Sequence, residues 1–100
     1  MQYDFVIVGA GSAGCVIANR LSENPACQVC LLEAGGPDKS PWIHIPAGYF
    51  KTMGNPQTDW CYKTEPDPGL NNRSIDWPRG KVLGGSSSIN GLLYVRGQPE

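Results

Sequence analysis

This sequence of 100 residues has no long hydrophobic run, and that absence excludes several classes of protein. No segment approaches the roughly 20 consecutive apolar residues of a membrane-spanning helix. The start does not have the pattern of a signal peptide, because no basic residues precede the first apolar stretch, Asp4 interrupts it and Gly9 ends it early. We therefore expect a cytoplasmic protein and leave peripheral association with a membrane open.

An excess of charge of either sign is also missing. The chain carries 8 Lys and Arg residues against 9 Asp and Glu residues, for a formal net charge of −1. The chain has no basic patch that would indicate a nucleic-acid partner, and it has no acidic tail that would indicate disorder. Internal repeats are absent too. A length of 100 residues allows at most one small domain.

Residues that commonly carry acid–base or metal chemistry are few. His44 is the only histidine, and no partner stands at a recognisable spacing, so we expect a structural or cofactor-flanking role. Cys27 and Cys30 have the spacing of a redox or zinc motif, but strand positions three apart point to opposite faces, and zinc would need a second ligand pair. Together with Cys15 and Cys61 they are predicted to be buried or half-buried free thiols, and no metal site is predicted.

Glycine is plentiful, and it marks the first motif. Phe5 to Val8 is a short apolar run rich in β-branched residues, which predicts a strand buried on both faces, as in a parallel sheet. Gly9, Gly11 and Gly14 then form Gly-x-Gly-x-x-Gly, and helical spacing predicts a helix over residues 12–23. In this motif a pyrophosphate approaches bare backbone at the helix N-terminus.

A second strand is predicted over residues 28–32, and it ends in Glu33. Glu33 lies about 20 residues after the last glycine, where an acid can bind the hydroxyls of a ribose. These features together predict a dinucleotide site. An ordinary β-α-β unit with a glycine turn is the structural alternative.

Residues 37–76 show no strong periodicity, and prolines interrupt any long helix. A structureless loop of this length does not suit a compact domain, so we predict an excursion over the surface of a larger protein. Asn71 and Asn72 are a turn signal, which predicts a hairpin between residues 60–64 and 73–77. Trp60 could cover a cofactor or pack in the core, and both possibilities stay open here.

Residues 77–97 form the second chemical stretch. Gly84 and Gly85 precede three serines, an arrangement that can form a nest of backbone N–H groups and in which the serines can cap a short helix. Arg79 and Lys81 add positive charge beside it. Such a stretch suits a phosphate or a flavin ring, and a glycine-rich connection between core elements is the alternative.

Three blocks together resemble the N-terminal part of the glucose–methanol–choline (GMC) family of FAD-dependent oxidoreductases, and in particular choline-dehydrogenase-like alcohol dehydrogenases. The blocks are Gly9-x-Gly11-x-x-Gly14, Glu33-Ala-Gly35 and Arg79-Gly-Lys-Val-Leu-Gly-Gly-Ser-Ser-Ser-Ile-Asn-Gly91. The resemblance implies an α/β fold that occupies residues 1–100. It divides into a Rossmann-like β-α-β unit (1–36), a loop-rich excursion with a short hairpin (37–76) and a signature block with a short cofactor-facing helix (77–97).

The resemblance also implies roles for individual residues. The backbone from Gly9 to Gly14, with Ser12 and Ala13, would hold the pyrophosphate, and Glu33 would bind the adenosine ribose with Ala34 beside it. The other predicted cofactor-binding residues, along the cofactor path and beside the flavin, are Trp60, Gly80, Gly84, Ser86, Asn90, Gly91, Leu92 and Leu93. Ile89 stands where some members carry a histidine that attaches FAD covalently, so we expect non-covalent FAD.

The implied reaction oxidises the CH–OH group of a small-molecule alcohol, with hydride transfer to flavin N5 and electrons passing on to oxygen, a quinone or another acceptor. Family members are several times longer, and their catalytic histidine lies near the C-terminus. We therefore expect this chain to be an N-terminal piece that supplies FAD contacts and no catalytic residue. The alternatives are an NAD(P)-dependent Rossmann dehydrogenase, whose ribose Glu33 would also suit, and a non-catalytic flavin-binding module. Residues 77–97 favour FAD, because a nicotinamide domain would more commonly continue with a third strand and helix.

Overall fold

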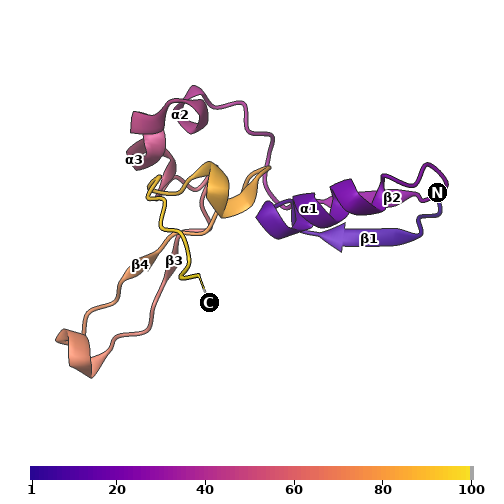
Figure 1. Ribbon diagram of the computed structural model, residues 1–100. Coiled ribbons are helices and arrows are strands. Elements are labelled where there is room, and N and C mark those ends of the chain that lie inside the picture. The colour runs from indigo at the N-terminus through magenta and orange to yellow at the C-terminus, as the bar shows by residue number, and fades with distance from the viewer. Residues whose placement is uncertain (100) are drawn as a thin grey trace.

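The computed structural model describes residues 1–99, so the end of the predicted domain at Glu100 lies outside the described residues. Figure 1 shows a β-α-β unit at one end, a group of short helices and a hairpin at the other, and the gold segment of the signature block between them. The signature block thus lies between the other two parts of the chain.

The β-α-β unit consists of β1 (Phe5–Val8), α1 (Ser12–Leu21) and β2 (Val29–Leu32). The strands pair in parallel, with Phe5 opposite Val29 and Val8 opposite Leu32. Short runs of β-branched and apolar residues favour strands, and the helix between them makes the crossover that parallel pairing requires. The predicted unit is confirmed. Helix α1 ends two residues before the predicted end at residue 23, and β2 begins one residue after the predicted start at residue 28.

The prediction that the first strand is buried on both faces is wrong for the described chain. Phe5, Val6 and Val8 are 47%, 57% and 84% exposed. In the described part of the chain, β1 pairs only with β2, and α1 covers one face of the pair. The apolar composition of β1 suits a strand that is buried on both faces. Within the described residues, however, no other element covers most of its apolar surface.

Residues 37–76 contain more regular structure than predicted. Two single-turn helices, α2 (Pro41–His44) and α3 (Tyr49–Thr52), flank a 3-10 turn at Pro46–Gly48. Proline starts α2 and the 3-10 turn, because its fixed φ and missing N–H suit the first position of a helix. The prolines therefore limit helix length, as predicted, but they also begin α2 and the 3-10 turn.

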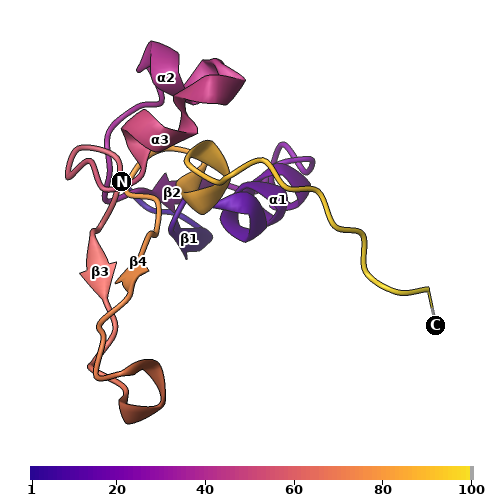
Figure 2. The same ribbon diagram turned by 90° about the vertical axis from the view of Figure 1, so that its left-hand side faces the viewer.

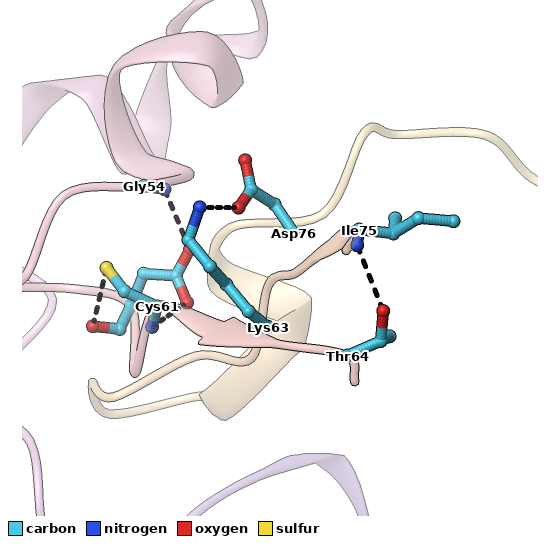
Figure 3. A network of polar contacts seen from close by, with 7 residues as sticks. Gly54, Cys61, Lys63, Thr64, Ile75 and Asp76 are labelled. Carbon is cyan, nitrogen blue, oxygen red and sulfur yellow. Dashed lines mark hydrogen bonds and ion pairs between the residues drawn. The ribbon is translucent and has the colours of Figure 1, made fainter. Parts of the chain in front are cut away.

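The predicted hairpin is confirmed. Strand β3 (Tyr62–Lys63) pairs antiparallel with β4 (Asp76–Trp77). Asn71 and Asn72 turn the chain with φ values of 57° and 56°, a left-handed conformation that asparagine tolerates well. Figure 3 shows two further links between the strands, an ion pair from Lys63 to Asp76 (2.9 Å) and a hydrogen bond from the Ile75 N–H to Thr64 Oγ1 (2.9 Å).

The signature block docks across the ends of β1 and β2. The Leu83 N–H donates to Gly36 O (2.9 Å) and the Gly84 N–H to Ala10 O (2.8 Å), while the Lys81 N–H donates to Thr58 O (2.8 Å). Figure 2 shows this segment beside the β-α-β unit. The buried apolar residues of the described chain include Ala10, Val82 and Ile89, so the core lies where the block meets the glycine turn.

The molecule is extended for its length. Its radius of gyration is 16.7 Å, whereas a compact domain of 100 residues has a radius of about 13 Å. The chain after the signature serines runs away from the body in Figure 2, and Leu93 is 92% exposed. Among residues 1–99 no helix has the length and apolar character needed to cross a bilayer.

Candidate functional site

The glycine turn between β1 and α1 presents bare backbone. Gly9 has a φ of +98°, which favours glycine, and its N–H donates to Leu32 O (2.7 Å). A Cβ added to Gly9 or Gly11 would meet no atom within 4 Å, whereas one on Gly14 would collide with the Gly9 carbonyl. The turn is therefore open at its first two glycines and tightly packed at the third.

The N-terminus of α1 has no side-chain cap within the described chain, since its N-cap residue is Gly11. The first N–H groups of a helix have no intrahelical acceptor and attract negative charge. Ser12, Ala13 and Gly14 form the first turn of α1 and line the space in front of it. This geometry fits a phosphate group.

Glu33 lies at the end of β2 and connects the two strand ends. Its Oε2 accepts from the Ala10 N–H (2.8 Å), and its Oε1 accepts from the Gly35 N–H (2.9 Å). The half-buried carboxylate is thereby fixed in orientation. Each carboxylate oxygen can accept more than one hydrogen bond, so acceptor capacity remains for a ribose hydroxyl.

A cleft of about 600 Å³ opens beside Glu33. It is bordered by the ends of β1 and β2, by the tryptophan that precedes the hairpin and by the signature block. The lining residues are Val8, Gly9, Gly11, Leu32, Glu33, Ala34, Trp60, Arg79, Gly80, Gly85 and Ser86. A neighbouring hollow of about 490 Å³ shares Gly9, Gly11 and Ser86 with it and adds the first turn of α1. The fold thus brings the glycine turn, Glu33 with Ala34, and part of the signature block to one place.

The two glycine motifs touch backbone to backbone. Gly85 has a φ of +63°, and a Cβ there would lie 2.8 Å from Gly11 Cα. The Gly80 N–H donates to Ser86 Oγ (3.0 Å), and Ser12 Oγ donates to Ser87 Oγ (3.2 Å). Close approach of this kind needs glycine at the contact, which explains why both motifs are rich in it.

The prediction that the serines cap a short helix is wrong. A 3-10 helix does form at Gly85–Ser88, but Gly84 is its N-cap. Ser87 Oγ instead donates to Gly84 O (2.6 Å) and Ser88 Oγ to Leu83 O (2.8 Å), both carbonyls that precede the helix. Ser87 and Ser88 donate to these carbonyls, and no side chain caps the N–H groups of the first turn.

Trp60 lines the cleft and does not pack in a core. It is 41% exposed and lies parallel to the Tyr62 ring at 5.9 Å, and Lys81 Nζ is 4.7 Å from its ring centroid. The guanidinium of Arg79 faces the Trp77 ring at 4.9 Å. Of the two predicted cations, Lys81 therefore stands against the cleft wall, and Arg79 turns its charged end toward the hairpin.

Of the residues predicted to lie beside the flavin, Ser86 lines this cleft, but Asn90, Gly91, Leu92 and Leu93 do not. Asn90 and Leu92 border a separate small hollow beside α2 and α3, and the Leu92 N–H donates to Asn90 Oδ1 (3.1 Å). A Cβ added to Gly91 would lie 4.0 Å from Met53 Cε, and Leu93 is exposed. The described chain therefore assembles one end of the predicted site and leaves these four residues apart from it.

The histidine and the cysteines lie outside the cleft. His44 Nε2 is 2.5 Å from Asp38 O, a contact between the last residue of α2 and the loop that precedes this helix. Cys27 and Cys30 are half-buried free thiols, as predicted, but the prediction is wrong for Cys15 on α1 and for Cys61 before β3, which are both exposed. No group of three potential metal ligands occurs among residues 1–99.

Asp59 is a residue that the sequence analysis missed. It is 2% exposed, and its carboxylate accepts from the N–H groups of Gly54 (2.7 Å), Cys61 (2.9 Å) and Arg79 (3.0 Å), the first two of which Figure 3 labels. Burial alone would raise the pKa of Asp59, but these hydrogen bonds outweigh it and hold the pKa below the ordinary value of 3.8. The bond to Cys61 is a local turn pattern typical of aspartate, whereas the other two have no local signal.

Comparisons with known proteins decide the family. A sequence model described as GMC oxidoreductase matches residues 3–100. The chain belongs to the GMC oxidoreductase family. The predicted family, and FAD as the cofactor of that family, are confirmed.

This GMC chain is similar to several enzymes over almost all of its length. It is 56% identical over 99 residues to an alcohol dehydrogenase [acceptor] of Pseudomonas putida, covering 99% of this chain. It is also 56% identical over 100 residues to an oxygen-dependent choline dehydrogenase of Sinorhizobium medicae, covering 100% of this chain. The chain spans 18% of the length of each of these two relatives.

The GMC chain also matches a solved structure. Pyridoxine 4-oxidase from Mesorbium loti superposes with a TM-score of 0.91 at 44% identity, over 98% of this chain and 19% of that one. The agreement supports the α/β FAD-binding fold.

Proposed function

We propose that this chain forms the part of an alcohol-oxidising flavoenzyme that binds the ADP half of FAD. The observation that carries the proposal is the single cleft into which the fold brings Gly9, Gly11, Glu33 and Gly85, residues from all three sequence blocks. An open glycine turn at an uncapped helix N-terminus suits a pyrophosphate, and the acid beside it suits a ribose.

Each residue has a role that follows from its position. The backbone from Gly9 to Gly14 binds the pyrophosphate, Glu33 accepts from ribose hydroxyls, and Trp60 and Gly80 form the opposite wall. When bound, FAD supplies the acceptor for the hydride of the alcohol carbon, at flavin N5. The chain itself binds and orients the cofactor, and the catalytic histidine and most of the substrate pocket are expected in sequence outside these 100 residues.

An alcohol is the proposed substrate class, because the relatives named above act on alcohols or choline. Ile89, at the position of the family's attachment histidine, is 2% exposed and belongs to the core, which supports non-covalent binding.

The test is the visible spectrum of the purified protein at its full natural length. We expect flavin absorbance bands, release of the flavin into the supernatant after acid precipitation, and reduction of a dye acceptor when simple alcohols are added. NAD binding without flavin bands would instead support a nicotinamide dehydrogenase. Flavin bands without turnover of any alcohol would support a non-catalytic flavin module.

A further inference from the structure

Asp59 lies between the cofactor cleft and a second hollow. It borders that hollow, of about 370 Å³, together with Cys61 and Lys63, whereas the next residue, Trp60, lines the cleft. An aspartate this deeply buried usually has a cationic partner. Within residues 1–99 no Lys or Arg forms an ion pair with it, and backbone N–H groups take that place.

The three N–H donors come from three segments of the chain. Gly54 follows α3, Cys61 belongs to the turn into the hairpin, and Arg79 opens the signature block. The bond to Cys61 accompanies a φ of +55° at that residue, a conformation that is uncommon for a residue with a Cβ and persists only where its surroundings impose it. The buried carboxylate is therefore one of the groups that fix the turn on which Trp60 stands.

The same carboxylate also fixes Arg79 and Gly80, the segment opposite Trp60. The Arg79 N–H donates to Asp59 Oδ1, and the Trp60 N–H donates to Arg79 O (2.9 Å). Asp59 pairs with Gly80 in an antiparallel bridge. Trp60, Arg79 and Gly80 are the cleft wall that faces the glycine turn, and each is bonded or paired to Asp59 or to its immediate neighbour.

We propose that Asp59 is a positioning residue for the cofactor, which holds Trp60 and the backbone of Arg79 and Gly80 as one wall of the cleft without lining the cleft itself. The inference rests on the proposed function of the cleft as a FAD site. It adds a residue that carries no motif and acts through its neighbours.

The experiment measures the Kd of FAD for the apoprotein of the full natural length, by flavin fluorescence. Asp59→Ala removes both acceptor oxygens and with them all three hydrogen bonds, and it is expected to raise the Kd about tenfold or more. In Asp59→Asn, the side-chain oxygen can still accept from the N–H groups of Cys61 and Arg79, whereas the amide NH2 faces the Gly54 N–H and loses that bond. This variant is therefore expected to raise the Kd only about threefold. Asp67→Asn is the matched control, because Asp67 Oδ1 accepts from the Gly69 N–H (2.7 Å) at the hairpin tip, and its Kd should equal that of the wild type.

A double-mutant cycle with Trp60→Ala separates positioning from general loss of stability. If Asp59 acts through Trp60, Asp59→Ala changes the Kd much less in the Trp60→Ala background than in the wild type. Independent, multiplicative effects would overturn the inference, as would an unchanged Kd in both Asp59 variants. If Asp59→Ala does not fold, Asp59→Asn replaces it in the same cycle. A wild-type apoprotein that takes up no FAD would overturn the proposed function and this inference together, whereas normal uptake by the wild type with unaffected variants overturns the inference alone.

Discussion

Glu33 and Asp59 are two carboxylates at the same cleft in different surroundings. Glu33 is half-buried at the cleft edge with two N–H donors, while Asp59 is fully buried behind the wall with three. A carboxylate at an edge can still accept bonds from a ligand, whereas a buried carboxylate that accepts from three backbone N–H groups orders the chain around it. At the scale of single residues, the first acid is suited to binding and the second to positioning.

Replacement of Glu33 by Ala is expected to weaken FAD binding and folding together. Loss of the ribose hydrogen bonds should cost roughly 2–4 kcal/mol of FAD affinity. Because the N–H groups of Ala10 and Gly35 also lose their acceptor, the free energy of unfolding of the apoprotein should fall by about 1–3 kcal/mol. FAD titration and denaturant unfolding of the full-length protein measure the two effects.

Glu23→Ala is the matched control for this variant. Glu23 pairs with Arg20 at 2.7 Å on the exposed surface of α1, and such pairs contribute about 0–1 kcal/mol. FAD affinity equal to that of the wild type in Glu33→Ala would remove Glu33 from the site.

The stability that Asp59 contributes should depend on pH in a defined direction. Its pKa is lower in the folded chain than the ordinary value of 3.8, so its contribution is fully present above that value and is lost as the pH falls through the depressed pKa. We expect the difference in unfolding free energy between wild type and Asp59→Asn to be constant near neutral pH and to shrink below pH 3.8. Urea unfolding at a series of pH values measures it, and a difference that grows on acidification would contradict the assignment.

At the scale of elements, the β1–α1 turn has separate binding and packing positions. Gly11 opens onto empty space, while Gly14 packs against the carbonyl of Gly9. A phosphate needs the first property, and the contact between helix and turn needs the second.

Alanine at the two glycines should therefore have different effects. Gly11→Ala adds a methyl group where no atom lies within 4 Å, so the apoprotein should keep its melting temperature and lose FAD affinity about tenfold or more. Gly14→Ala should lower both the melting temperature and the affinity. Gly36→Ala, also with free space around its Cβ but outside the cleft, should change neither. Equal loss of melting temperature in the Gly11 and Gly14 variants would contradict the division.

At the scale of the whole molecule, the main feature is apolar surface that no other part of residues 1–99 covers. Large side chains on β1, on α1 and in the segment after the signature serines are between about half and nine-tenths exposed, as Val8, Val16 and Tyr94 illustrate at 84%, 59% and 88%. A chain of this length that leaves so much apolar surface in water has little burial to offset its conformational entropy.

The 100-residue chain expressed by itself should therefore be marginally stable and bind FAD weakly. Far-UV circular dichroism in urea should show a broad transition of low cooperativity, and gel filtration should separate the chain from added FAD. A single sharp transition together with retention of FAD through the column would contradict this expectation. The full-length protein, treated in the same way, is the control.

The parts of the site that could be predicted from sequence are those whose chemistry is local. A β-branched run, glycines at fixed spacing and an acid at the end of the next strand belong to one short β-α-β unit, so residue types and spacing were enough to place Gly9, Gly11, Gly14 and Glu33 together. The hairpin could be predicted as well, because the turn signal of Asn71 and Asn72 is also local. The exposure of β1 could not be predicted, because composition does not show what covers a strand.

The sequence alone determined the family, the cofactor class and the glycine cradle, because these depend on residue types at short spacing. Only the tertiary structure decided which predicted residues share one cleft: Gly80 and Ser86 line it, whereas Gly84 and Asn90 to Leu93 do not, and Gly85, which was not predicted, takes the place of Gly84. It also decided the place of Asp59, whose bond to the Arg79 N–H spans 20 residues. Contacts between distant segments depend on how the segments pack, and no local pattern of residues records that packing.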